Sequence, residues 1–350
     1  MERAKIVVAL APVFLASSPV FAAGSINVGS DAVLNLELGV TTVVQSTDGL
    51  EEDESRASYS FDVVAEVELG DKGVVFASLN TAQGGSVDTG AIAGSNGDDE
   101  SGDISEGGYS ETRVAELWYQ LPVNDLVTVT VGKIDPTGIF DANEYANDET
   151  AQFLGDTFIN NMAVPFPGYA AGLHVGLNLS ESVQLNFGAF EPKDDFEGTL
   201  DESFFMVEAT FSLSLGGRDG NYRVGYWSCD ACGDETNSGV TLSFDQAVTD
   251  NLGLFLRYGD RDETIDDNYD SAISGGLQYA FGDHQAGAGY SILTADGDGF
   301  DDETQWEIYY SYACNDYLTL TADIQSISAP GLDSDVDDVT VFGVRAQLSF

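Results

Sequence analysis

Three arginines, Arg223, Arg257 and Arg345, each stand between apolar residues in segments where polar and apolar side chains alternate. Acidic residues occupy equivalent positions in other segments: Glu37, Asp62, Glu66, Glu116, Glu208, Asp245, Glu307 and Asp323. A guanidinium donates hydrogen bonds and a carboxylate accepts them, so opposed groups of these kinds suit hydroxyl-bearing solutes. The set predicts a polar inner surface, and the alternative for each residue is a hydrated ion pair.

Three aromatic residues are candidates for stacking on a sugar. Trp227 falls on the same side of its segment as the charges above, and Phe140 and Phe153 lie in a long connecting segment. The apolar face of a pyranose ring fits against an aromatic platform. For all three residues the alternative is ordinary packing against other apolar groups.

Neither histidine completes a catalytic constellation. His174 and His284 are predicted to lie at different depths of the fold, so they do not combine into a hydrolytic site. His174 is expected to be a polar residue of the inner surface. The sequence therefore predicts no enzyme, and a membrane-embedded hydrolase would need a serine or an aspartate beside His174.

Predicted β-strands must position these side chains. In Leu34 to Val40, for example, every second residue is apolar, and the same period of two recurs along the chain. Sixteen such segments lie near residues 32–44, 58–69, 73–80, 109–121, 126–134, 169–179, 183–191, 203–214, 221–228, 238–246, 251–259, 271–281, 285–293, 304–313, 317–326 and 338–350. Each has one apolar and one polar face.

The connections between the segments alternate in length. From the second connection onward every other link is short, such as Gly70-Asp71-Lys72 or Leu215 to Gly220, and the links between them are mostly longer and acidic, such as Gln83 to Gly108. A soluble sandwich has no reason to sort its loops in this way, whereas a transmembrane barrel has short turns on one rim and long external loops on the other. We therefore expect an all-β transmembrane antiparallel barrel of about sixteen strands, with about fourteen or eighteen as alternatives.

In a membrane barrel, the arginines and acidic residues named above must point either to the lipid or to the lumen. An arginine or lysine on the lipid face costs about 2–4 kcal/mol near the midplane, so the charges above are expected to point into the lumen. Aromatic residues near strand ends suit the girdles at the two membrane interfaces. These residues are Trp306, Tyr310, Tyr312 and Tyr317.

The first residues read as a secretory signal peptide. Arg3 and Lys5 precede an apolar run, and a small-residue stretch follows at residues 16–23. The run is shorter than the ~20 residues of a spanning helix, which argues against the alternative of a membrane anchor. We expect cleavage near Ala22, so that residues 1–22 are removed and residues 23–350 form one barrel domain.

The last segment carries an independent indication of the same membrane. Phe342, Val344, Ala346, Leu348 and Phe350 share one face, and the chain stops on the aromatic residue. Barrel-assembly signals resemble this pattern. Together with the signal peptide it predicts the outer membrane of a Gram-negative bacterium.

The formal net charge is −48, which repels nucleic acid and anionic membrane surfaces. Strong acidity often indicates disorder, but 43% apolar and 11% aromatic residues give this chain enough surface to bury. Solvated acidic loops on a folded body fit better. A saline habitat, in which salt screens the charge, is a further explanation of the acidity.

Cys229 and Cys232 form a Cys-x-x-Cys pair, and Cys314 stands alone. Without a second such pair or a nearby histidine, a loop disulfide in an oxidising exported setting is favoured over free thiols or zinc. Cys314 is expected to stay unpaired.

The acidic loop at residues 296–303 resembles the start of a calcium loop, with Asp296, Asp298 and Asp301 as candidate ligands. It lacks the full spacing, so a solvated loop that holds divalent ions loosely, bridging lipopolysaccharide phosphates, is the favoured reading. No cofactor is predicted.

The third long loop, about residues 135–168, differs from the others because it is rich in Phe, Ile and Leu. Its polar residues include Asp141, Asn143, Asp148 and Glu149, and Asn147 with Glu149 and Gln152 suits the start of a short helix. Apolar content in a loop indicates packing against another surface. We expect this loop to fold into the barrel and narrow the pore.

This stretch resembles the OprB-type carbohydrate-selective porin family. The resemblance rests on Gly132-Lys133-Ile134-Asp135, on Phe140-Asp141-Ala142-Asn143, on Asn147-Asp148-Glu149 and on Gln152-Phe153-Leu154, and it covers about residues 116 to 190. It implies a sixteen-stranded channel selective for small saccharides, with the third external loop as its constriction.

The sequence thus predicts passive diffusion of small hydrophilic solutes, above all saccharides. One alternative is a barrel for other small solutes such as metal chelates. Another is a closed barrel whose acidic loops bind ions or surface partners. Such channels are commonly trimers, and a homotrimer in contact with lipid and lipopolysaccharide is the expected setting.

Overall fold

The computed structural model describes residues 24–28, 32–50, 54–85, 87, 92, 94–97, 112–192, 202–232, 236–262, 268–297 and 299–350. The predicted signal peptide lies outside these residues. Within them, no helix has the length and apolar character needed to cross a membrane.

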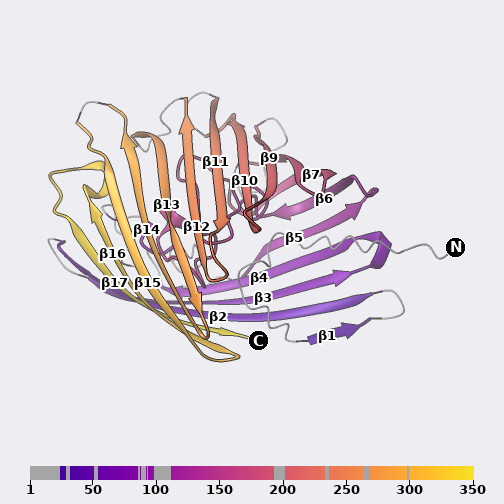
Figure 1. The fold of residues 1–350 in the computed structure, drawn as a ribbon, viewed down its shortest axis with the longest axis horizontal. Helices are drawn as coiled ribbons and strands as arrows, with labels where there is room; N and C mark the ends of the chain where they lie inside the picture. Colours follow the sequence, from indigo (N-terminus) through magenta and orange to yellow (C-terminus); the bar gives the residue numbers. More distant parts are fainter. Residues whose placement is uncertain are drawn as a thin grey trace.

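Long strands occupy all sixteen segments predicted from alternation, which confirms the fold class and the strand number. They are β2 (Val33–Asp48), β3 (Ser55–Glu68), β4 (Val74–Gly84), β5 (Thr112–Pro122), β6 (Val127–Ile134), β7 (Ala170–Ser180), β8 (Val183–Phe190), β9 (Phe204–Leu215), β10 (Arg218–Cys229), β11 (Asn237–Ala247), β12 (Leu252–Arg261), β13 (Tyr269–Phe281), β14 (His284–Ala295), β15 (Glu303–Asn315), β16 (Leu318–Ser328) and β17 (Val339–Ser349). Each pairs antiparallel with the next, and β17 pairs with β2, which closes the barrel (Figure 1).

The closing seam brings the two ends of the barrel domain together. Phe350 N donates to Leu38 O at 2.8 Å, and Leu38 N donates to Phe350 O at 3.0 Å. A further strand, β1 (Gly24–Asn27), pairs with Val33 to Leu36 of β2 beyond that point. The sequence did not predict β1, because four residues are too few to show a period of two.

The two faces of the wall differ as the alternation predicts. On β12, Leu254 and Leu256 are 42% and 39% exposed, whereas Phe255 and Arg257 are 4% and 1% exposed. The exposed apolar set is therefore the outer face, and the alternate set points inward. Aromatic residues lie on the outer face toward both ends of the strands. Trp306, near the long-loop end of β15, is exposed, as are Tyr310 and Tyr312 toward its short-turn end, and Tyr317 stacks on Phe350.

The connection between β9 and β10 is shorter than predicted. Gly216 and Gly217 both have positive φ, 62° and 80°, and they alone connect β9 to β10. Two consecutive residues at positive φ match the right-handed twist of the flanking strands. The link predicted over Leu215 to Gly220 is therefore shorter, and Arg218 begins β10.

Candidate functional site

The segment between β6 and β7, residues 135–169, contacts the inner face of the wall. It holds one helical turn, α2 (Asp156–Ile159). The helix start predicted at Asn147 is wrong, because Asp148 Oδ1 instead accepts from Thr150 N at 2.8 Å and Ala151 N at 3.1 Å and closes a turn.

Inward-facing glycines of the wall make room for this segment. A Cβ atom at Gly253 of β12 would lie 2.1 Å from the Tyr145 ring, and one at Gly289 of β14 would lie 2.7 Å from the Phe158 ring. Glycine weakens a strand and marks places where another group approaches the backbone closely. These glycines therefore act as sockets for side chains of the segment.

Arg257 of β12 binds the segment at its centre. Its Nε lies 2.6 Å from Asp141 Oδ2, and its Nη2 donates to Asp141 O at 3.1 Å and to Asn147 Oδ1 at 2.8 Å. Its Nη1 donates to the carbonyl oxygens of Ala146 and Phe158. All five N–H donors of the guanidinium are thus used, so Arg257 holds the segment instead of facing a solute.

Asp141 is the residue of the segment that contacts both Arg257 and Glu208 of the wall. Its φ of 59° lies in the left-handed region, which aspartate tolerates better than most residues, and its backbone N donates to Glu208 Oε2 at 2.8 Å. Burial raises the pKa of the Asp141 carboxyl, whereas the Arg257 charge and a hydrogen bond from Asn161 act in the opposite direction. Both partners of the ion pair are buried, so neither is satisfied by water.

Two further wall residues hold the middle of the segment. Arg345 of β17 donates from Nη1 to Glu149 O at 2.6 Å and from Nη2 to Gln152 O at 2.9 Å. The Glu307 carboxylate of β15 accepts from Leu154 N at 2.6 Å and Gly155 N at 2.8 Å. Arg345 therefore binds the segment backbone, like Arg257, and is only 1% exposed.

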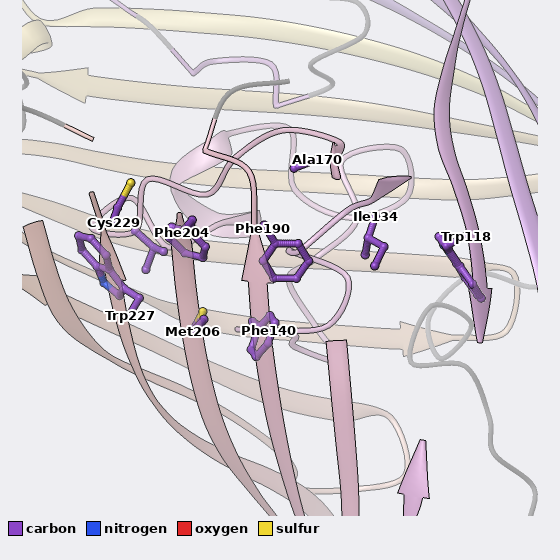
Figure 2. Packing of buried hydrophobic residues seen from close by; sticks show 10 residues of the cluster. Trp118, Ile134, Phe140, Ala170, Phe190, Phe204, Met206, Trp227 and Cys229 are labelled. Carbon is purple, nitrogen blue, oxygen red and sulfur yellow. The ribbon is translucent and has the colours of Figure 1, made fainter. Parts of the chain in front are cut away.

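The predicted stacking rings pack into apolar clusters. Phe153 lies 4.9 Å from Tyr309 and 5.4 Å from Phe255 between ring centroids. Trp227 stacks on Phe204, and Phe140 lies near Phe190 in the cluster drawn in Figure 2. All three predicted rings are 0% exposed, so the packing alternative fits and none presents a free face to a sugar.

The start of the segment is fixed by Glu116 of β5. Its Oε2 accepts from Trp118 Nε1 and from Asp135 N, both at 3.0 Å. Burial raises the pKa of the Asp135 carboxyl, although Thr137 donates to it. Glu116 is 6% exposed, so it binds the segment instead of lining open space.

His174 of β7 points inward, and its Nε2 lies 3.0 Å from Asn186 Oδ1 while the ring meets Phe140 edge-on. Asn143 of the segment donates from Nδ2 to Phe244 O at 3.1 Å. Both side chains therefore contribute polar contacts inside the barrel.

A second group of inward residues stays half-buried. On the wall these are Asp62 and Glu66 of β3 with Glu37 of β2, and on the segment they are Glu144, Asp148 and Glu149. Because the outer face is apolar, the exposed part of these side chains faces the interior of the barrel.

Glu144 sits beside an ion pair of the wall. Arg223 Nη1 lies 2.6 Å from Asp245 Oδ2. Burial and the Asp245 charge raise the pKa of Glu144 to about 7, while the Arg223 charge acts in the opposite direction.

Sequence reasoning missed Arg113 of β5, an inward cation that is half-buried. Its Nε donates to Asn80 Oδ1 at 3.2 Å, and its guanidinium lies 5.2 Å from the centre of the Tyr169 ring. The register places Asp62, Asn80 and Arg113 in one row across β3, β4 and β5. A bulge between Ser78 and Leu79 shifts the parity in β5, which hid this residue.

The remaining predicted sites lie at the long-loop rim. Cys229 and Cys232 are joined by a disulfide with Cα atoms 5.5 Å apart, whereas Cys314 is free and lies at the opposite rim, beside the short turn between β15 and β16. Of the calcium candidates, Asp298 lies outside the described residues and Asp301 accepts from Ser334 Oγ. Among the described residues there is no group of three or more His, Cys, Asp or Glu side chains arranged for a metal ion.

Substituting a socket glycine tests the docking of the segment. We expect Gly289→Ala to displace Phe158, to lower the free energy of unfolding by about 1–3 kcal/mol and to expose residues 135–169 to protease. The control is Gly168→Ala, where a Cβ atom meets nothing within 4 Å. Equal protease resistance of the two variants would contradict the socket.

The model of the family described as "Carbohydrate-selective porin, OprB family" matches residues 48–231 and 233–350. An uncharacterized protein of Aquifex aeolicus is 32% identical over 222 residues, which are 63% of this chain and 64% of that relative, so just under two thirds of its length is spanned.

Solved structures share the fold. A high-pH structure of Pseudomonas putida OprB is 18% identical with a TM-score of 0.72, covering 91% of this chain and 94% of that one. A low-pH structure of the same protein is 20% identical with a TM-score of 0.60, covering 91% and 92%. A mutant of the Rh. blastica porin is 19% identical with a TM-score of 0.61, covering 91% and 100%.

Proposed function

The chain belongs to the carbohydrate-selective porin OprB family, and we propose that it lets saccharides diffuse passively across the outer membrane through the space beside the segment 135–169. The proposal includes export through a signal peptide at residues 1–22. Homotrimer formation, contact with lipopolysaccharide and loosely held divalent ions remain predictions.

The observation that carries the proposal is the uneven covering of the inner wall. Phe255, Glu307 and Arg345 lie under the segment and are at most 4% exposed. On the inner face of β2 and β3, Glu37, Asp62 and Glu66 are half-buried, although residues nearer the long-loop end, such as Val43 and Ser60, are at most 2% exposed. This difference in burial supports a path between Glu37, Asp62 and Glu66 and the half-buried edge of the segment at residues 144–150.

The groups along this path suit hydroxyl-bearing solutes. Asp62 accepts hydrogen bonds and Arg113 donates them, and both are half-buried, so the two ends of this row offer partners to a sugar, whereas Asn80 between them is buried and accepts from Arg113. Each bond replaces one with water, so the net gain is small and a solute is not trapped. Weak exchange of this kind is what passive diffusion requires.

Planar-bilayer recording tests the function. We expect the purified protein to form ion-conducting pores, and we expect titration with glucose or maltose to reduce the current because a sugar occupies the same path. Absence of conductance would overturn the channel. Conductance unaffected by either sugar, with passage of metal chelates instead, would favour the alternative solute class.

Glu144 makes conductance depend on pH. Its pKa of about 7 means that it gains negative charge as the pH rises through neutrality, so we expect K⁺ conductance to increase over that range. Since this folded-state pKa exceeds the ordinary value of about 4.3, the same group makes the free energy of unfolding fall as pH rises between the two values. Glu144→Gln should abolish the conductance step, and a step centred near pH 4 in the wild type would contradict the assignment.

A further inference from the structure

Four arginines of the inner face are withdrawn from the lumen. Arg257 and Arg345 are each 1% exposed and donate to the segment, and Arg223 is 9% exposed and paired with Asp245. Arg261 is 4% exposed and lies 3.9 Å over the Tyr269 ring. A count of inward arginines therefore overstates the positive charge that a solute meets.

The acidic residues divide into two sets, because Glu116, Glu208, Asp245, Glu307 and Asp323 of the wall are buried like the arginines, whereas a second set is only half-buried. Glu37, Asp62 and Glu66 on the wall and Glu144, Asp148 and Glu149 on the segment are half-buried on the inner side. These two groups lie on the two sides of the proposed path. Among the other inward basic residues that the structure describes, Arg113 is half-buried and lies in the same row as Asp62, and Arg56 is exposed at the long-loop end of β3, where it pairs with Glu54 at 2.8 Å.

Charge of one sign in a narrow, low-dielectric passage concentrates ions of the opposite sign. Rings of Asp and Glu select cations in channels, and rings of Arg and Lys select anions. Here the segment uses the arginines, together with Glu116, Glu208 and Glu307, as structural clamps, and the half-buried carboxylates stay beside the path. The sign of the passage is therefore set by how the segment docks.

We propose that this channel is cation-selective and that it admits neutral and amino sugars while it disfavours anionic sugars such as uronates and sugar phosphates. This selectivity rests on the proposed saccharide channel. It adds the charge class of the permeating solute, which the family description does not contain.

The reversal potential in a KCl gradient across a planar bilayer tests the sign directly. We expect K⁺ to be roughly tenfold or more permeant than Cl⁻. The double variant Asp62→Asn, Glu66→Gln should move the ratio toward one, and Asp283→Asn, at an exposed short turn, should leave it unchanged. A reversal potential of the opposite sign, or a double variant that keeps the full ratio, would overturn the inference.

Liposome swelling compares three sugars of nearly equal size. Glucosamine and glucose should enter faster than glucuronate, and faster entry of glucuronate would overturn the inference even if the channel conducts. Absence of both conductance and swelling would instead overturn the proposed function, so the two failures are distinguishable. Retained heat-dependent gel mobility shows that each variant is still a folded barrel.

Discussion

The buried ion pair between Arg257 and Asp141 is the interaction on which the interior depends. Its atoms lie 2.6 Å apart in a site closed to water, and removing one partner of such a pair typically costs about 3–5 kcal/mol because the other charge is left unpaired. The wall supplies the cation and the segment supplies the anion. Separating Arg257 from Asp141 would leave a buried charge without a partner, so the ion pair keeps the segment against β12.

This one constraint explains the asymmetry of the lumen. Once Asp141 is fixed, Tyr145 and Phe158 reach the wall where Gly253 and Gly289 leave room. The segment then covers the inner faces of β12, β15 and β17, and the inner faces of β2 and β3 keep half-buried carboxylates. The left-handed backbone at Asp141 is a local strain that the Arg257 and Glu208 contacts offset.

The strands were predictable because period two and loop length are local properties of the sequence. The inward direction of Arg257 was also predictable, since a charge on the lipid face is costly. Its role was not, because an inward guanidinium serves as a pore group or as a clamp according to the path of a segment more than a hundred residues away in sequence. Inward glycines such as Gly289 were the overlooked indication of that path, and the bulge in β4 and β5 concealed Arg113.

A double-mutant cycle on Arg257 and Asp141 tests this account most directly. Single-channel conductance and the free energy of unfolding would be measured for Arg257→Met, Asp141→Asn and the double variant. The account predicts that each single variant is destabilised and conducts more, because the segment loosens, and that the double variant is no worse than either. Strictly additive losses, or single variants with wild-type conductance, would contradict it.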